Sequence, residues 1–69
     1  MSDHAQIKLT MAERRLLELF ARGHPPAQAA EALCQAPMET EALLASLLRR
    51  HGLTTRRQLL ARAVVYRWI

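Results

Sequence analysis

The sequence has very little cysteine: Cys34 is the only one among 69 residues, so no disulfide can form within the chain. A domain of this size buries only about 60% of the surface that its unfolded chain exposes. Small domains commonly compensate with disulfides, a bound metal or a partner chain. We therefore expect Cys34 to be a reduced, semi-buried thiol in a cytosolic protein, and a partner chain to supply part of the stability.

Long apolar runs and metal-site spacings are also absent. No segment approaches the roughly 20 apolar residues of a membrane-spanning helix, and the start of the chain lacks the pattern of a signal peptide. The histidines His4, His24 and His51 do not share metal-ligand spacing. Cys34 and His51 lack a third group that would orient them as a catalytic pair. These absences predict a soluble, cytoplasmic protein that is not an enzyme, with no metal, cofactor, small-molecule ligand or membrane partner.

The apolar residues follow a helical pattern without strand-like alternation. Capping boxes, helix-starting prolines and helix-ending glycines divide this pattern into four predicted helices. The helices run from Thr10 to Gly23, from the Pro25-Pro26 pair to Leu33, from Pro37 to about His51 and from Arg56 to about Arg67. Residues 1–8 are predicted to be a flexible N-terminal arm, and residues 9–69 a single all-α domain.

The segment LTMAERRLLELFARGH resembles the opening of the DNA-binding domain of LuxR-type transcription regulators. The matching residues are Leu9, Thr10, Glu13, Arg14, Leu17, Ala21 and Gly23, then Ala30, Glu31 and Leu33, then Leu47, Leu48, Arg49, Arg50, Gly52 and Leu53, and finally Arg56, Gln58 and Leu59. The resemblance covers residues 9 to about 69, and the same opening also resembles region four of sigma factors. It implies a stand-alone, four-helix helix-turn-helix domain: a tri-helical core with its helix-turn-helix at residues 26–51, and a C-terminal dimerisation helix.

Two residues of the turn before the third helix depart from the LuxR-type pattern. Cys34 stands where the family usually has glycine, which predicts a non-glycine residue at positive φ. Ala36 replaces the usual serine cap of the recognition helix, a loss of about 1 kcal/mol that Pro37 and Glu39 offset in part. The turn is therefore predicted to be strained and poorly capped.

The third helix has a core face and an outer face when its residues are placed at about 100° intervals. The predicted core face consists of Thr40, Leu44, Leu47 and His51, flanked by Leu43 and Leu48; the predicted outer face consists of Met38, Ala42, Ala45 and Arg49, with Ser46 nearby and Glu39 and Glu41 at its edges. We expect His51 to lie half-buried at the helix C-terminus, where a cation is favoured.

The outer face of the third helix is degenerate as a reader of DNA bases. Base readout in the major groove needs donors such as arginine, lysine, asparagine or glutamine. LuxR-type domains commonly carry lysine where Glu41 stands, and a carboxylate there is repelled by phosphate. A face built on Met38, Ala42 and Ala45 suits close packing against another helix, and it is equally compatible with simple exposure to solvent. The predicted protein-interaction face is Met38, Glu41, Ala42, Ala45 and Arg49.

The fourth helix supplies a second predicted interface. The resemblance implies that this helix mediates dimerisation, and Leu60, Val64 and Trp68 follow one another at four-residue spacing, with Val65 and Ile69 on a neighbouring stripe. Leu59 and Ala63 are expected in the core. We predict Leu60, Val64, Trp68 and Ile69 as the dimer contact, and expect Trp68→Ala to weaken partner binding while leaving the helical spectrum nearly intact.

Two functions from different classes are compatible with these features. In the first, the chain is a bacterial or phage transcription-regulatory protein that acts by protein–protein contact, as an anti-activator of a LuxR-type or similar regulator. In the second, it is a sequence-specific DNA-binding LuxR-type regulator, which the net charge of +4 favours. Its possible phosphate contacts are Arg49, Arg50, Arg56 and Arg57, which are otherwise solvated surface. A third alternative is a sigma-like contact with RNA polymerase. The expected partners are thus another protein, a second copy of the chain, or DNA.

Overall fold

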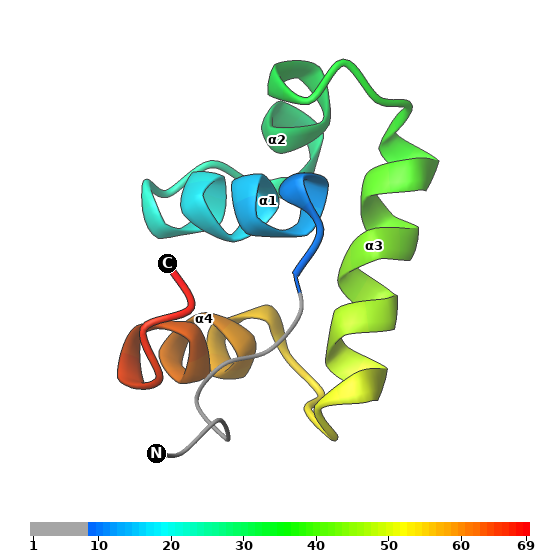
Figure 1. The fold of residues 1–69 in the computed structure, drawn as a ribbon. Coiled ribbons are helices and arrows are strands. Elements are labelled where there is room, and N and C mark those ends of the chain that lie inside the picture. The colour runs from blue at the N-terminus through cyan, green and yellow to red at the C-terminus, as the bar shows by residue number, and fades with distance from the viewer. Residues whose placement is uncertain (1–8) are drawn as a thin grey trace.

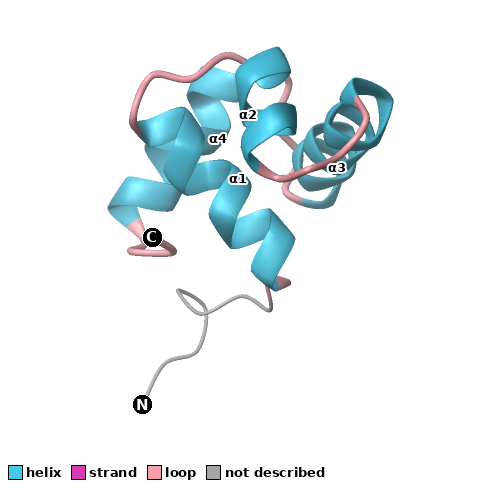
Figure 2. Ribbon diagram, turned by 90° about the horizontal axis from the view of Figure 1, so that it is seen from above, coloured by secondary structure: helices cyan, strands magenta, loops and turns pink. Residues whose placement is uncertain are grey.

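A computed structural model describes residues 9–69, which form four helices and contain no strand. The helices are α1 (Met11–Ala21), α2 (Pro26–Ala32), α3 (Pro37–Arg50) and α4 (Arg56–Val65). In Figures 1 and 2, α3 runs along one side of the molecule, while α1, α2 and α4 lie together on its other side. The prediction of an all-α fold is confirmed for this part of the chain. The prediction of an N-terminal arm at residues 1–8 lies outside the described residues.

Side-chain caps at the start of α1 and α4 are the two predicted capping boxes. Thr10 Oγ1 accepts from the Glu13 N–H at 3.0 Å, and Glu13 Oε1 accepts from the Thr10 N–H at 3.0 Å. At α4, Thr55 Oγ1 accepts from the Gln58 N–H at 3.1 Å, and Gln58 Oε1 accepts from the Thr55 N–H at 3.2 Å. Each box satisfies two backbone donors that a helix start otherwise leaves unpaired.

The start of α3 keeps only half of such a box. Ala36 occupies the cap position and its methyl group accepts no hydrogen bond, whereas the Glu39 carboxylate accepts from the Ala36 N–H at 2.9 Å. The predicted loss of the serine cap is therefore confirmed. Glu39 partly offsets the loss by its hydrogen bond and by its negative charge in the first turn.

All four described helices end in the same way, with a left-handed residue just beyond the helix. These residues are Gly23 (φ 92°), Cys34 (φ 57°), Gly52 (φ 66°) and Arg67 (φ 58°). In each case two backbone N–H groups fold back onto carbonyls of the last turn, as Cys34 N to Glu31 O at 3.1 Å and Gln35 N to Ala30 O at 2.9 Å illustrate for α2. The positive φ predicted for Cys34 is confirmed, whereas the turn at Arg67 was not predicted.

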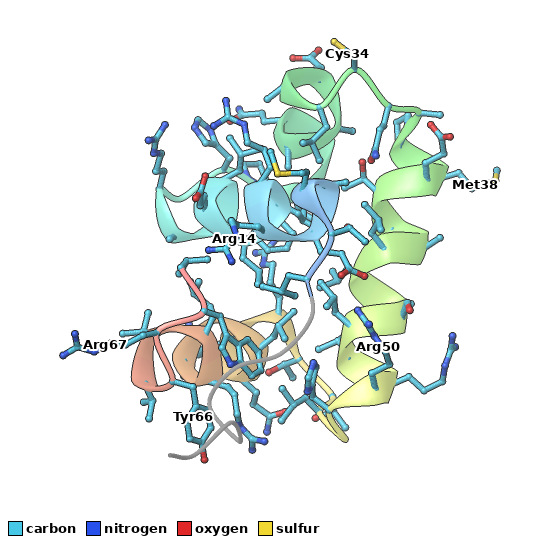
Figure 3. The ribbon with its side chains drawn as sticks, viewed as in Figure 1. Arg14, Cys34, Met38, Arg50, Tyr66 and Arg67 are labelled. Atoms are coloured by element: carbon cyan, nitrogen blue, oxygen red, sulfur yellow. The ribbon has the colours of Figure 1, made fainter. Side chains whose placement is uncertain are left out.

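Cys34 itself is exposed, so the expectation of a semi-buried thiol is wrong. Figure 3 shows its side chain at the outer tip of the turn between α2 and α3. At Cys34 the backbone is left-handed, so the chain reverses direction there. The preceding residue, Leu33, packs against the core, whereas the side chain of Cys34 points to solvent.

Replacing Cys34 with glycine is expected to stabilise the domain. An L-residue in the left-handed region costs about 1–2 kcal/mol of stability, and glycine removes that cost. Glycine in turn costs about 0.5–1 kcal/mol, because it loses more backbone entropy when the chain folds. The net gain in the free energy of unfolding is thus about 0.5–1 kcal/mol, measurable by urea denaturation. Cys34→Ala is the matched control, because it removes the thiol and keeps the backbone cost. An alanine variant as stable as the glycine variant would contradict the argument.

The core is a single apolar cluster to which every helix contributes. Its buried members are Leu16, Leu17, Leu19, Phe20, Ala29, Leu47, Leu59, Ala63 and Trp68. The inner face of α3 is as predicted, with Thr40 and Leu47 fully buried and Leu44 and His51 partly buried. The buried hydroxyl of Thr40 donates to Gln35 Oε1 at 2.9 Å, which removes the cost of burying an unpaired polar group.

Trp68 belongs to this core, and its predicted place in a dimer contact is wrong. α4 ends at Val65, earlier than expected, and the left-handed turn at Arg67 folds Trp68 back so that only 5% of it is exposed. Its carbonyl accepts from Arg14 Nη1 at 3.0 Å, which ties the C-terminal segment to α1. The four-residue spacing therefore breaks after Val64, because Trp68 does not continue the helix.

Of the other residues predicted at the dimer contact, Leu60 and Ile69 are partly buried against the core. Val64 is 60% exposed and Val65 is 72% exposed. The large apolar residues of α4 that are strongly exposed are thus the two valines of its last turn.

Candidate functional site

The outer face of α3 consists of Met38, Glu41, Ala42, Ala45 and Arg49, and all five residues are exposed. Met38 is 82% exposed, and Figure 3 shows it pointing away from the rest of the molecule. A shallow hollow of about 360 Å³, lined by Gln35, Glu39, Ala42, Leu43 and Ser46, borders this face on one flank. The two alanines leave the helix backbone open to close approach, because their side chains project little beyond it.

Hydrogen-bond donors are scarce on this face. Arg49 is the one member of the five with a side-chain donor, and Glu41 can only accept. Glu39, at the edge, already accepts from the backbone of the preceding turn. The surface can therefore pack against an apolar or small-residue surface more readily than it can read the edges of base pairs.

Charges are segregated along the chain, a feature that the net charge conceals. Residues 23–48 contain three glutamates and no lysine or arginine, whereas residues 49–69 contain six arginines and no aspartate or glutamate. The first turns of α3 are consequently acidic, and its end and α4 are basic. The order of charges along the sequence was a sufficient signal for this polarity, which a count of charges misses.

Arg50, one of the four arginines predicted as possible phosphate contacts, is engaged within the fold. Its Nη2 forms an ion pair with Glu13 Oε2, and Glu13 is only 6% exposed. The second carboxylate oxygen of Glu13 caps α1, so one side chain both starts α1 and anchors the end of α3. This link between residues 37 positions apart carries no local sequence signal.

The other three predicted phosphate contacts, Arg49, Arg56 and Arg57, are exposed. The guanidinium carbon of Arg56 lies 5.2 Å from the centroid of the Phe20 ring, in a cation–π arrangement. Arg56 and Arg57 line one cleft together, whereas Arg49 does not line it. The structure thus divides these arginines between two surfaces.

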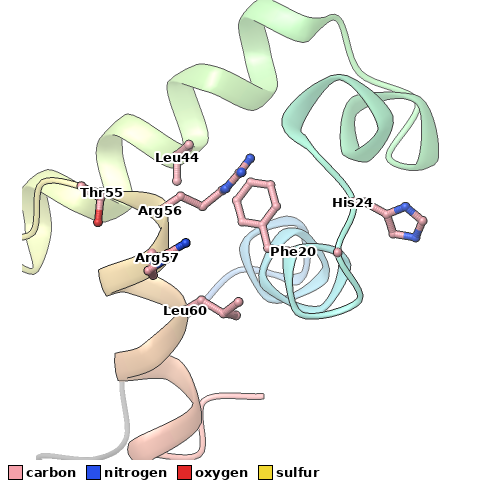
Figure 4. A pocket seen from close by; sticks show the side chains of 8 residues that line it. Phe20, His24, Leu44, Thr55, Arg56, Arg57 and Leu60 are labelled. Atoms are coloured by element: carbon pink, nitrogen blue, oxygen red, sulfur yellow. The ribbon is translucent and has the colours of Figure 1, made fainter.

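The cleft lies where the end of α1, the middle of α3 and the start of α4 meet (Figure 4). It has a volume of about 470 Å³ and is lined by Phe20, Gly23, His24, Leu44, Thr55, Arg56, Arg57 and Leu60. Its apolar residues come from three helices, and this is why no pattern within one segment predicts it. We refer to it below as the α1–α4 cleft.

His51 is held away from the charged form, contrary to the expectation of a cation at this helix end. Burial lowers its pKa below the ordinary value of 6.5, the positive charges of Arg50 and Arg62 lower it further, and the carboxylate of Glu13 opposes them. Its ring packs on Trp68, with centroids 4.7 Å apart.

Acidification is therefore expected to destabilise the domain through His51. The unfolded chain takes up a proton near pH 6.5 and the folded chain only at lower pH, so the unfolded state binds more protons between the two values. The free energy of unfolding then falls as the pH drops through this window and is unaffected by His51 above it. We expect a lower melting temperature at about pH 5.5 than at about pH 7.5, with a smaller difference in His51→Gln. Equal differences in the two proteins would contradict the assignment.

Comparisons of the chain with known protein families, with curated proteins and with solved structures each find no match. Within residues 9–69, no helix has the length and apolar character needed to cross a bilayer. Among the same residues, no three histidine, cysteine or acidic side chains are grouped so that they could hold a metal ion.

Proposed function

We propose that the chain is a small transcription-regulatory protein that acts by binding another protein through the outer face of α3. The observation that carries the proposal is the composition of that face: it is exposed, small and apolar at its centre, and acidic at one end. Small side chains let a partner helix approach closely, and an exposed methionine, here Met38, adapts to an irregular partner surface.

The resemblance of residues 9–69 to the LuxR-type domain supports the class of partner. Helices α2 and α3 are joined by the four residues 33–36, a connection of the length found in helix-turn-helix units, which supports this resemblance. A chain built like one half of a LuxR-type dimer can pair with an activator through α4, or it can cover the activator's recognition helix. Either arrangement leaves one half-site of the operator unread, which costs several kcal/mol of specific binding. The proposed role is that of an anti-activator.

An operator-release assay tests this proposal. LuxR-type regulators from the genome that encodes the chain are each bound to their operator duplex, and the purified chain is added. We expect the chain to release at least one regulator from its duplex, with formation of a protein–protein complex that contains no DNA. Release of none of them, with no complex formed, would contradict the proposal.

A second candidate function is sequence-specific DNA binding through the helix-turn-helix at residues 26–51. The observation that favours it is the series of six arginines in residues 49–69, uninterrupted by any acid. Arg49, Arg56 and Arg57 would neutralise phosphates, and affinity would fall steeply with salt. Salt-dependent binding of the chain itself to a selected duplex distinguishes this function from the first.

A further inference from the structure

We propose that the α1–α4 cleft binds a short segment of a partner protein in which a carboxylate side chain stands beside a bulky apolar side chain. The cleft shares no residue with the outer face of α3, so the inference goes beyond the proposed function and assigns a second surface at which a partner can bind.

The apolar part of the cleft is formed mainly by Leu44 and Leu60, from α3 and α4; Phe20 of α1 also lines it but is only 5% exposed, with Arg56 over its ring. Leu44 and Leu60 are only partly buried although they pack against the core, so each leaves apolar surface facing the cleft. In Figure 4, Leu44 lies above and Leu60 below, and the Arg56 side chain extends between Leu44 and Phe20. A volume of about 470 Å³ accommodates a leucine or phenylalanine side chain together with its backbone.

The basic part of the cleft is formed by Arg56 and Arg57 in the first turn of α4. Within residues 9–69, neither arginine forms an ion pair, and no acidic residue lines the cleft. Stacking on Phe20 holds the Arg56 guanidinium at the opening, where the partial positive charge of the helix start adds to it. A guanidinium fixed in this way is suited to a carboxylate, which it can bind through two parallel hydrogen bonds.

The juxtaposition of these two parts favours a peptide over a phosphate backbone. A phosphodiester chain satisfies the arginines and leaves the exposed parts of Leu44 and Leu60 in water. A glutamate or aspartate next to leucine or phenylalanine satisfies both parts at once. Burial of the apolar side chain also strengthens the ion pair, because it removes water from around the charges.

An NMR titration of the isotopically labelled chain tests the inference with two tripeptides, acetyl-Leu-Glu-Phe-amide and acetyl-Leu-Gln-Phe-amide. We expect saturable shift changes at Phe20, Leu44, Arg57 and Leu60 with the glutamate peptide, and at least tenfold weaker binding of the glutamine peptide. The double variant Arg56→Gln/Arg57→Gln should weaken binding of the glutamate peptide at least tenfold. The double variant Arg62→Gln/Arg67→Gln, which also removes two positive charges but outside the cleft, should change it less than twofold.

Three results would overturn the inference: no saturable binding, equal binding of the two peptides, or the same shift changes with inorganic phosphate at equal concentration. The operator-release assay keeps this outcome distinct from that of the proposed function. If the chain releases a regulator but does not bind the peptides, only the proposed cleft site is wrong. If the cleft binds the glutamate peptide but the chain releases no regulator, only the proposed anti-activator role is wrong.

Discussion

Replacing Trp68 with alanine is expected to lower the free energy of unfolding by about 2–4 kcal/mol. Removal of a buried tryptophan costs about 3–5 kcal/mol, and part of this is offset because its indole N–H is buried without a partner among residues 9–69. For a domain of this length, the melting temperature should fall by at least about 10 °C, as followed by circular dichroism. The variant should therefore lose helical signal at moderate temperature. The sequence alone predicts instead that its helical spectrum stays nearly intact.

Val65→Ala is the matched control for this prediction. Val65 is 72% exposed on the last turn of α4, three residues from Trp68, and its replacement should change stability by less than about 0.5 kcal/mol. A Trp68→Ala variant as stable as Val65→Ala would contradict the placement of Trp68 in the core and would restore the α4 stripe as a candidate dimer surface.

The substitution Ala42→Asp is expected to weaken binding to a regulator identified by the release assay by about 30-fold or more. A carboxylate at the centre of a closely packed interface must be desolvated without a partner, which costs about 2–3 kcal/mol or more in binding. The cost to folding is smaller, below about 1 kcal/mol, because Ala42 is exposed and only helix propensity changes. Binding is measured by titration calorimetry, and folding by circular dichroism on the same sample.

Ala27→Asp provides the comparison for Ala42→Asp. Ala27 is exposed on the first turn of α2, so the same charge is introduced away from the outer face of α3. We expect unchanged binding in this variant. Equal losses of affinity in the two variants would indicate a general effect of negative charge, and no loss in either would move the interface away from Ala42.

Local chemistry made the helix boundaries of this fold predictable. The signals are threonine caps with Glu13 or Gln58 three residues later, prolines at helix starts and glycines at helix ends. Each signal acts within a few residues, so it can be recognised from the spacing in the sequence. The positive φ of Cys34 was accessible for the same reason. Arg67 was not, because a left-handed arginine is uncommon and nothing in its neighbours marks it.

The missed features depend on contacts between segments far apart in the sequence. The fold-back of Trp68, the ion pair of Glu13 with Arg50 and the low pKa of His51 arise only once α1, α3 and the C-terminal segment are assembled. The α1–α4 cleft has the same origin. The residues of the outer face of α3 could be predicted from the sequence because the periodicity of one helix determines them. The identity of a binding partner cannot be read from the sequence of this chain.

We propose that the exposed side of α3 contacts protein and does not read bases. The most direct measurement is a selection from random DNA duplexes with the purified chain at moderate salt, followed by sequencing of the retained pool. We expect the chain to retain duplexes weakly and in a salt-sensitive way, without enrichment of any sequence motif. Enrichment of one motif, with binding lost in Arg49→Ala and Glu41→Ala and unaffected in Ala27→Asp, would contradict it.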